Sequence, residues 1–261
     1  MIYEKIAIHP DRPHITLTTY VSEISPELPN NKKTAVLVLP GGGYWICADR
    51  EAEPVAKAFF AAGMNAFVLR YSVKEEADGY TPLLDAATAI KYIRDHADEW
   101  NIDKDKIVVC GFSAGGHLAA SISALWKLDI VSKTLGCENS YVKPNGMILG
   151  YPAISADDSK AKSDESKAYN IFYSKKHIDA DTCPAFVWHT AADNLPVENS
   201  LHVCEALSAH KIPFELHVFP YGEHGLSIAT KEIAMHEGMI MPYVGRWINM
   251  AIQWINEALF A

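Results

Sequence analysis

The sequence predicts an α/β fold: a doubly wound, mostly parallel sheet with antiparallel N-terminal strands and helices on both faces. Short apolar runs typical of buried strands alternate with helical segments from residue 35 to the C-terminus. The two segments before that point have the composition of strands and are separated by a short turn. The chain has 261 residues, 49% of them hydrophobic, which is enough for the large core of such a sheet. We therefore expect a single domain over residues 1–261.

The first half of the chain supplies the early strands. Residues 2–8 and 15–21 are rich in β-forming side chains and are predicted to be antiparallel edge strands. The run 35–39 is wholly apolar, as in a strand buried on both faces. A helix is predicted from apolar spacing over 52–60, with Gly63 ending it. The next strand covers 65–71, and a helix runs from a cap at Thr81 to about residue 96.

The second half continues the alternation. Strands are predicted at 107–110, 147–151, 185–189 and 214–219. Helices are predicted from residue 114 to about 128, from Pro196 onward, and over 244–255. The helix from Pro196 would present Val197, Leu201, Cys204 and Leu207 on one face. The polar segment 155–181 lacks periodicity and is either a solvated excursion or a small lid beside the site.

The composition excludes several classes of partner. The net charge is −9, and no Lys/Arg cluster offers the basic face of a nucleic-acid binder. No apolar run approaches membrane-spanning length, and residues 1–5 show no signal pattern. The five cysteines lack C-x-x-C spacing and predict buried thiols rather than disulfides or a zinc site. We expect a cytoplasmic protein without metal or cofactor. The sequence allows either a monomer or a homo-oligomer.

The segment Gly111-Phe112-Ser113-Ala114-Gly115 predicts a nucleophile. It has the pattern G-x-S-x-G, between an apolar strand and a run of small residues typical of a helix. On such a strand–turn–helix junction, glycines remove side chains that would collide with the neighbouring strand and helix. The hydroxyl of Ser113 would then stand clear at the end of the sheet.

A serine hydroxyl needs a base, and His224 is the best placed of the eleven histidines. It follows the last predicted strand, between Gly222 and Gly225, and ligands gather at the carboxyl ends of strands in such sheets. An ordinary turn histidine is the alternative. His117 is nearer in sequence to the serine, but it lies on the helix behind it, where a structural role is expected.

The acid that orients the histidine is predicted to be Asp193. It follows the strand 185–189, one strand before His224. The alternative role for Asp193 is a helix cap before Pro196. The fallback acids have worse placement: Asp157, Asp158, Asp179 and Asp181.

An oxyanion formed by serine attack needs rigid N–H donors. Ala114 follows the nucleophile directly, and Gly41-Gly42-Gly43 lies at the end of the run 35–39, where its backbone can approach a substrate closely. Tyr44 and Trp45 follow the glycines and either line an acyl or alcohol pocket or belong to the core.

These segments resemble the α/β-hydrolase superfamily, and within it the small carbohydrate and acetyl esterases (BD-FAE-like and xylan-esterase-like). The resemblance covers the chain from about residue 35, through the segments 39–44, 49–56, 111–119, 186–193 and 214–225. It implies a triad in the order serine, acid, histidine. Hormone-sensitive-lipase-like esterases carry His-Gly-Gly-Gly, whereas this chain has Pro40 before the glycines. By analogy, Gly42 and Gly43 would donate to the oxyanion with Ala114.

The resemblance and the site residues together predict a serine carboxylesterase. Its substrates would be short-chain acyl esters, in particular acetyl esters of carbohydrates such as acetylated xylo-oligosaccharides. The alternatives are a peptidase or other acyl hydrolase of the same fold, and, from another class, a non-catalytic ligand-binding protein on a hydrolase fold.

Overall fold

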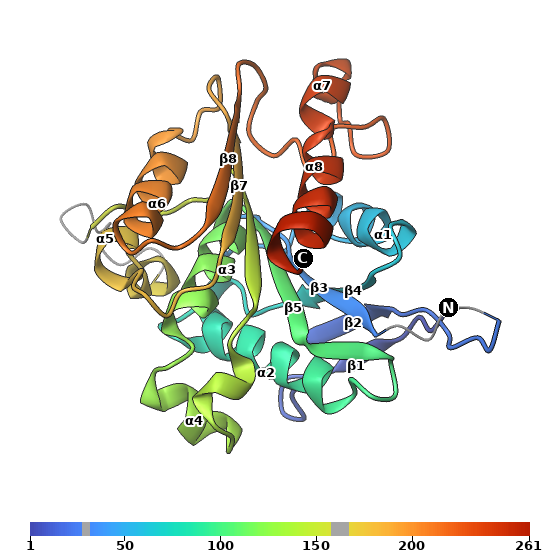
Figure 1. The fold of residues 1–261 in the computed structure, drawn as a ribbon. Coiled ribbons are helices and arrows are strands. Elements are labelled where there is room, and N and C mark those ends of the chain that lie inside the picture. The colour runs from blue at the N-terminus through green and yellow to red at the C-terminus, as the bar shows by residue number, and fades with distance from the viewer. Residues whose placement is uncertain (28–31, 158–166) are drawn as a thin grey trace.

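A mixed eight-stranded sheet forms the centre of the computed structural model, which describes residues 1–27, 32–157 and 167–261 (Figure 1). The strand order is β1-β2-β4-β3-β5-β6-β7-β8, antiparallel for the β1–β2 and β2–β4 pairs and parallel from β4 to β8. The predicted fold class is confirmed, but of the two N-terminal strands only β1 lies at the edge. The strands are β1 Lys5–Ala7, β2 Thr16–Tyr20, β3 Lys33–Leu39, β4 Asn65–Arg70, β5 Ile102–Phe112, β6 Gly146–Gly150, β7 Ala185–Thr190 and β8 Phe214–Phe219.

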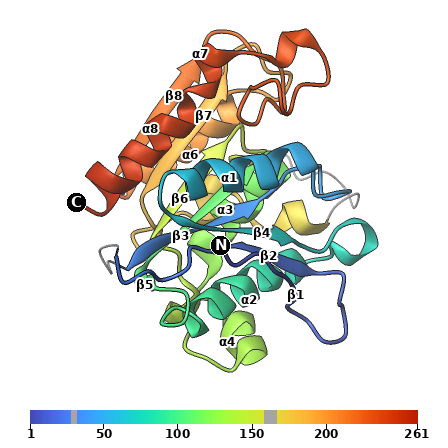
Figure 2. The ribbon, with the colours of Figure 1, turned by 90° about the vertical axis from the view of Figure 1, so that its right-hand side faces the viewer.

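Helices cover both faces of the sheet. α1 and α8 lie on one face, and α2, α3 and α6 lie on the other (Figures 1 and 2). No helix within the described residues is long and apolar enough to cross a membrane. The helices are α1 Glu53–Ala61, α2 Thr81–Asp95, α3 Ala114–Leu125, α4 Asp129–Leu135, α5 Ser174–His177, α6 Glu198–Ala209, α7 Pro242–Gly245 and α8 Trp247–Trp254, with a π-helical turn over Ile255–Leu259.

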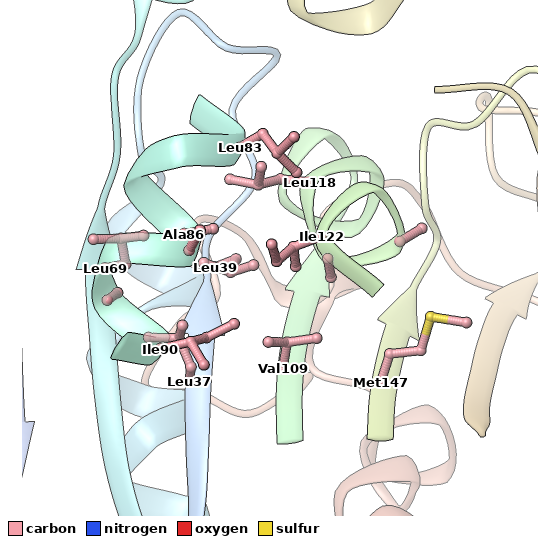
Figure 3. Close-up of a cluster of buried hydrophobic side chains, with 14 of the residues drawn as sticks. Leu37, Leu39, Leu69, Leu83, Ala86, Ile90, Val109, Leu118, Ile122 and Met147 are labelled. Carbon is pink, nitrogen blue, oxygen red and sulfur yellow. The ribbon is translucent and has the colours of Figure 1, made fainter. Parts of the chain in front are cut away.

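The core is two apolar layers, one on each side of the sheet. Alternate residues of β3 serve the two layers, because successive side chains of a strand point to opposite faces. Leu37 and Leu39 face α2 and α3, whereas Val36 and Val38 face α1 and α8. Figure 3 shows the first layer, where Leu83 and Ile90 of α2, Leu118 and Ile122 of α3, and Val109 of β5 surround Leu37 and Leu39. The predicted burial of β3 on both faces is confirmed.

The direction of winding changes at β3. This strand lies between β4, which follows it in the chain, and β5, so the chain leaves β3 to one side and returns to its other side. In a parallel sheet such a switch opens a crevice at the carboxyl ends of the two strands. The loop after β3 carries Gly41-Gly42-Gly43 and the turn after β5 carries Ser113, so the topology places these two segments together.

Two local predictions are wrong at α2 and α3. Thr81 is the first residue of α2 rather than its cap: its N–H already bonds to the carbonyl of Asp78, and Tyr80 holds the cap position. The elbow helix is also shorter than predicted. α3 ends at Leu125, and Leu128 leads into a separate helix, α4.

The buried face of α6 also differs from the prediction. Leu201 is 38% exposed, while Val203 shares the core with Cys204 and Leu207. α6 begins at Glu198, and Ser200 points inward to bond a histidine of β7. Ser200 and Val203 thus lie on the buried face of α6, and Leu201 faces outward.

A buried carboxylate ties the N-terminal turn to the body of the molecule. Asp85 of α2 is fully buried, and its Oδ1 accepts a hydrogen bond from Arg12 at 2.8 Å. Its Oδ2 accepts from the N–H of Ser72 at 2.9 Å, and Arg12 also donates to the Ser72 hydroxyl. Burial alone would raise the pKa of this carboxyl, but hydrogen bonds from His9, Ser72 and Arg12 outweigh it, and the pKa lies below its usual value.

Replacing Asp85 with asparagine is expected to lower the free energy of unfolding by about 3 kcal/mol at pH 7, because Arg12 loses its buried partner. A carboxyl whose pKa is lowered by folding stabilises the protein above its unfolded pKa of about 3.9, and this contribution is lost as the pH falls through the folded value. Urea unfolding at pH 7 and pH 3 measures both effects, and the difference between variant and wild type should shrink at pH 3.

The matched control is Glu76→Gln. Glu76 pairs with His14 at 2.8 Å, but both side chains are about half exposed. An exposed pair contributes at most about 1 kcal/mol. Equal losses in the two variants would contradict the role assigned to Asp85.

Candidate active site

Ser113 lies on a tight turn between β5 and α3. Its backbone has φ 51° and ψ −118°, a conformation that is strained for a residue with a side chain. The neighbouring glycines are required by close approach: a Cβ on Gly111 would lie 2.1 Å from the carbonyl oxygen of Gly115, and one on Gly115 would lie 2.0 Å from that of Leu39. The sequence prediction that these glycines prevent collisions with strand and helix is confirmed. The turn leaves the Ser113 side chain partly exposed at the carboxyl end of the sheet.

Two loops bring His224 and Asp193 to Ser113. His224 Nε2 lies 2.9 Å from Ser113 Oγ, and His224 Nδ1 lies 2.9 Å and 3.0 Å from the two carboxylate oxygens of Asp193. The loops follow β8 and β7, as predicted for a site at the carboxyl ends of the strands. With Nδ1–H donating to Asp193, Nε2 is free to accept the Ser113 proton. The arrangement can therefore generate a nucleophilic oxygen at Ser113.

Asp193 is held as a carboxylate by several donors. Burial would raise its pKa, but hydrogen bonds from His189, from His224 and from the N–H of Leu195 outweigh this and lower the pKa to about 2. The Leu195 N–H lies 2.7 Å from Oδ1. Asp193 thus forms a local turn with Leu195 rather than capping α6, which begins five residues after Asp193.

His189 is a supporting residue at the end of the predicted strand 185–189. It is fully buried, with Nδ1 at 2.8 Å from the hydroxyl of Ser200 and Nε2 at 3.1 Å from the carbonyl of Leu195. Nε2 also lies 3.5 Å from Asp193 Oδ2. The ring therefore fixes the turn that presents the acid. In the sequence, this role could have been inferred from the position of His189, four residues before Asp193 and directly after four apolar residues of the strand.

The glycine loop after β3 lies directly against the nucleophile. A Cβ on Gly41 would lie 3.0 Å from Ser113 Cβ, and the Gly41 N–H is already bonded to Glu51. Gly42 and Gly43 have φ 123° and 66°, in the region that favours glycine. The Gly42 carbonyl accepts from the N–H groups of Trp45 and Ile46, which closes the loop into a turn. Because Gly41 is engaged, Gly42 and Gly43 are the glycine amides left as oxyanion donors.

Ala114 occupies the first position of α3. The first N–H groups of a helix have no partner within the helix, and they carry its partial positive charge. The Ala114 amide is therefore suited to bind a negative oxygen beside Ser113. Its role stays a prediction, as do those of Gly42 and Gly43.

The structure places Tyr44 in the core, which is one of the two positions expected for it, and not on a pocket wall. It is 2% exposed, and its hydroxyl lies 2.9 Å from His117 Nδ1. Its ring packs edge-on against Tyr71 and Tyr169. Trp45 differs: it is 62% exposed, and its ring lies 3.6 Å from the Cβ position of Gly43. Trp45 therefore remains the candidate for substrate contact.

His117 lies inside the protein, away from the proton-transfer chain. It is 1% exposed, and burial lowers its pKa to about 4. It contacts Tyr44, Tyr169 and Phe172. These contacts agree with the structural role expected for His117.

The segment 155–181, expected to be either a solvated excursion or a small lid, falls partly outside the described residues. Its described parts are 155–157 and 167–181, and the second includes α5 and packs Tyr169 and Phe172 onto His117 of α3. Of the fallback acids, Asp179 bonds with Lys127, and Asp181 lies 3.1 Å from the same ammonium group. Asp158 lies outside the described residues.

Comparison with known proteins identifies the family. A crystal structure of MGS-M1, an α/β hydrolase from a Medee basin deep-sea metagenome library, is 40% identical and superposes with a TM-score of 0.84, covering 100% of this chain and 99% of that one. The chain belongs to the α/β-hydrolase family. Residues 24–143 match the family described as BD-FAE.

Two further relatives of this α/β hydrolase carry names that bear on substrate. The acetyl ester-xyloside bifunctional hydrolase of Caldicellulosiruptor lactoaceticus is 32% identical, with a TM-score of 0.78, 97% of this chain and 95% of that one being covered. The endo-1,4-β-xylanase B of Butyrivibrio fibrisolvens is 38% identical over 216 residues. The match covers 77% of this chain and 34% of that protein, so the chain spans about a third of the length of this relative.

Proposed function

We propose that this α/β hydrolase cleaves short-chain acyl esters, and in particular acetyl esters of carbohydrates, through an acyl-enzyme. The observation that carries the proposal is the continuous hydrogen-bond chain from Ser113 through His224 to Asp193. The xyloside-directed name of one relative and the xylanase name of another support the carbohydrate part.

Each residue has a defined role in the proposed reaction. Ser113 Oγ attacks the acyl carbon while His224 Nε2 takes the hydroxyl proton. The bond to the leaving alcohol then breaks, and His224 returns that proton to the alcohol oxygen. A water molecule, deprotonated by His224, then attacks the acyl carbon. The bond from that carbon to Ser113 Oγ breaks, His224 returns the proton to Oγ, and the acid leaves. Asp193 remains ionised throughout and stabilises the imidazolium that forms in each half-reaction.

The negative oxygen of each tetrahedral intermediate is assigned to the amides of Gly42, Gly43 and Ala114. Trp45 stands beside this glycine loop with most of its ring accessible. A large flat apolar side chain of this kind can pack on a sugar ring while leaving its polar groups in water. We assign Trp45 to the wall that contacts the substrate.

Two measurements test the proposal. A series of p-nitrophenyl esters of increasing chain length should give the highest kcat/KM at acetate or propionate, and acetylated xylo-oligosaccharides should release acetate. A preference for long acyl chains would contradict the carbohydrate-acetyl assignment. A fluorophosphonate probe should label Ser113, and a folded wild-type protein that resists labelling would favour a non-catalytic binder.

A further inference from the structure

A buried carboxylate lies behind the active site, on the short turn before α1. Glu51 is 1% exposed and is separated by sixty-two positions from Ser113 in the chain, yet its side chain reaches the loop beside the nucleophile. Its charge plays no part in the proton transfer described above. The segment 49–56 carries part of the family resemblance, which implies no role for Glu51 itself.

One oxygen of Glu51 holds the glycine loop. Oε2 accepts the Gly41 N–H at 2.7 Å. Gly41 has no room for a side chain: an added Cβ would lie 2.6 Å from this oxygen, 2.6 Å from the Phe112 carbonyl oxygen and 3.0 Å from Ser113 Cβ. Glu51 therefore holds the Pro40–Gly41 peptide, and the amides of Gly42 and Gly43 belong to the next two peptides of the same loop.

The other oxygen of Glu51 reaches the histidine loop through Tyr151. The Tyr151 hydroxyl donates to Oε1 at 2.7 Å and accepts the N–H of Ser227 at 3.0 Å. Its ring packs edge-on against the His224 imidazole, with centroids 4.9 Å apart. Tyr151 itself adopts φ 35°, so the ring is held in place against a backbone preference.

The residue before Glu51 strengthens the same connection. Arg50 Nε donates to the carbonyl of Gly225 at 3.0 Å, and the Ser227 hydroxyl donates to the Arg50 carbonyl at 2.5 Å. Both partners lie within three residues of His224. The turn that carries Glu51 thus contacts the glycine loop on one side and the histidine loop on the other.

A carboxylate in this position is costly, because ionised groups lose hydration on burial. Burial raises the pKa of Glu51, although the Tyr151 hydroxyl, the Arg50 charge and the Gly41 N–H act in the opposite direction. Two oxygens that both accept hydrogen bonds are needed to hold two donors on different loops. An apolar side chain could fill the space but could not hold either loop.

We propose that Glu51 is a positioning residue for ester hydrolysis, which fixes the oxyanion loop and the His224 loop relative to Ser113. The inference rests on the proposed function, since it concerns the same site. Small displacements of such groups cost large factors in rate, because oxyanion donors and the base must meet the transition state in a fixed geometry.

The test is Glu51→Gln. Glutamine preserves the size of the side chain, but its amide nitrogen cannot accept a hydrogen bond. That nitrogen must therefore face either the Gly41 N–H or the Tyr151 hydroxyl, both of which now donate to Glu51. Measured with p-nitrophenyl acetate and normalised to active sites titrated with a fluorophosphonate, kcat should fall about 10- to 100-fold. KM should stay within about threefold, because the loss falls on the transition state rather than on substrate binding. Titration separates this effect from a smaller folded fraction, which leaves kcat per site unchanged.

Two further variants complete the experiment. Glu53→Gln, on the same segment but about half exposed and paired with Lys57, should keep the wild-type kcat. Tyr151→Phe removes the hydroxyl that joins Glu51 to Ser227 and should lower kcat per site as well. The double variant Glu51→Gln/Tyr151→Phe should have a kcat little below that of the slower single variant, because both substitutions disrupt the same Glu51–Tyr151 hydrogen bond.

Several results would overturn the inference. A wild-type kcat per titrated site in Glu51→Gln would do so, as would independent, multiplying effects of the two single variants. If Glu51→Gln does not fold, a wild-type kcat in Tyr151→Phe would overturn it. A wild type that neither titrates nor hydrolyses the ester would instead refute the proposed function, and this outcome is separate because it needs no variant.

Discussion

Replacing Ser113 with alanine is expected to lower kcat for p-nitrophenyl acetate by about 10⁵- to 10⁶-fold, because no acyl-enzyme can form. The hydroxyl is the atom within 2.9 Å of His224 Nε2, and alanine removes it without adding bulk to the turn. The strained backbone at φ 51° is equally strained for alanine, so we expect the free energy of unfolding to change by no more than about 0.5 kcal/mol.

Intact-mass measurement after fluorophosphonate treatment checks the same variant. Wild type should gain one adduct, and the alanine variant should gain none. Ser208→Ala, at an exposed position near the end of α6, is the control and should label and turn over normally. Residual activity in Ser113→Ala above about 1% of wild type would assign the nucleophile to another residue.

Replacing Asp193 with asparagine is expected to lower kcat about 10⁴-fold while the fold stays intact. The carboxylate accepts from His224 Nδ1 and thereby leaves Nε2 as the acceptor for the Ser113 proton. An amide nitrogen facing Nδ1 would favour the opposite tautomer of the ring, which places a proton on Nε2. Ser113 then has no base.

The pKa of about 2 for Asp193 determines where the pH profile of kcat should be insensitive to this residue. Since folding lowers that pKa, the ionised form persists as the pH falls and is lost only as the pH passes through about 2. Protonation of Asp193 should therefore leave the pH profile of wild-type kcat unchanged between pH 4 and 9. The control variant is Asp98→Asn, at an exposed carboxylate paired with Lys32, and it should keep the wild-type kcat. If Asp193→Asn retains more than a tenth of wild-type kcat, Asp193 is not the orienting acid.

The parts of the fold and site that could be predicted from the sequence are those encoded by neighbouring residues. The apolar run of β3 and the glycines around Ser113 report local requirements, namely burial on both faces and close approach of backbones. The placement of Asp193 and His224 followed from strand order, with Gly222 and Gly225 as a further signal for His224, because side chains at the carboxyl ends of parallel strands lie at one edge of the sheet.

The residues that could not be predicted depend on contacts between distant segments. Tyr44 follows the glycine loop, yet it turns inward, where its hydroxyl lies 2.9 Å from Nδ1 of His117, a residue of a different element. In the sequence, Glu51 is an ordinary charged residue near the start of a helix. Its role depends on its contacts with Gly41 and Tyr151, which only the structure shows. No periodicity or spacing carries that information, because the partners lie ten and one hundred positions away.

The distribution of Ser113, Asp193 and His224 over β5, β7 and β8 has a consequence for how the molecule acquires its chemistry. Ser113 and His224 are 111 positions apart, and His224 follows the outermost strand of the sheet. A contact across this separation forms slowly, because the chain must first close a long loop. Turnover during refolding would thus require β8 in the sheet, and a chain still lacking β8 there would hold Ser113 with no base to activate it.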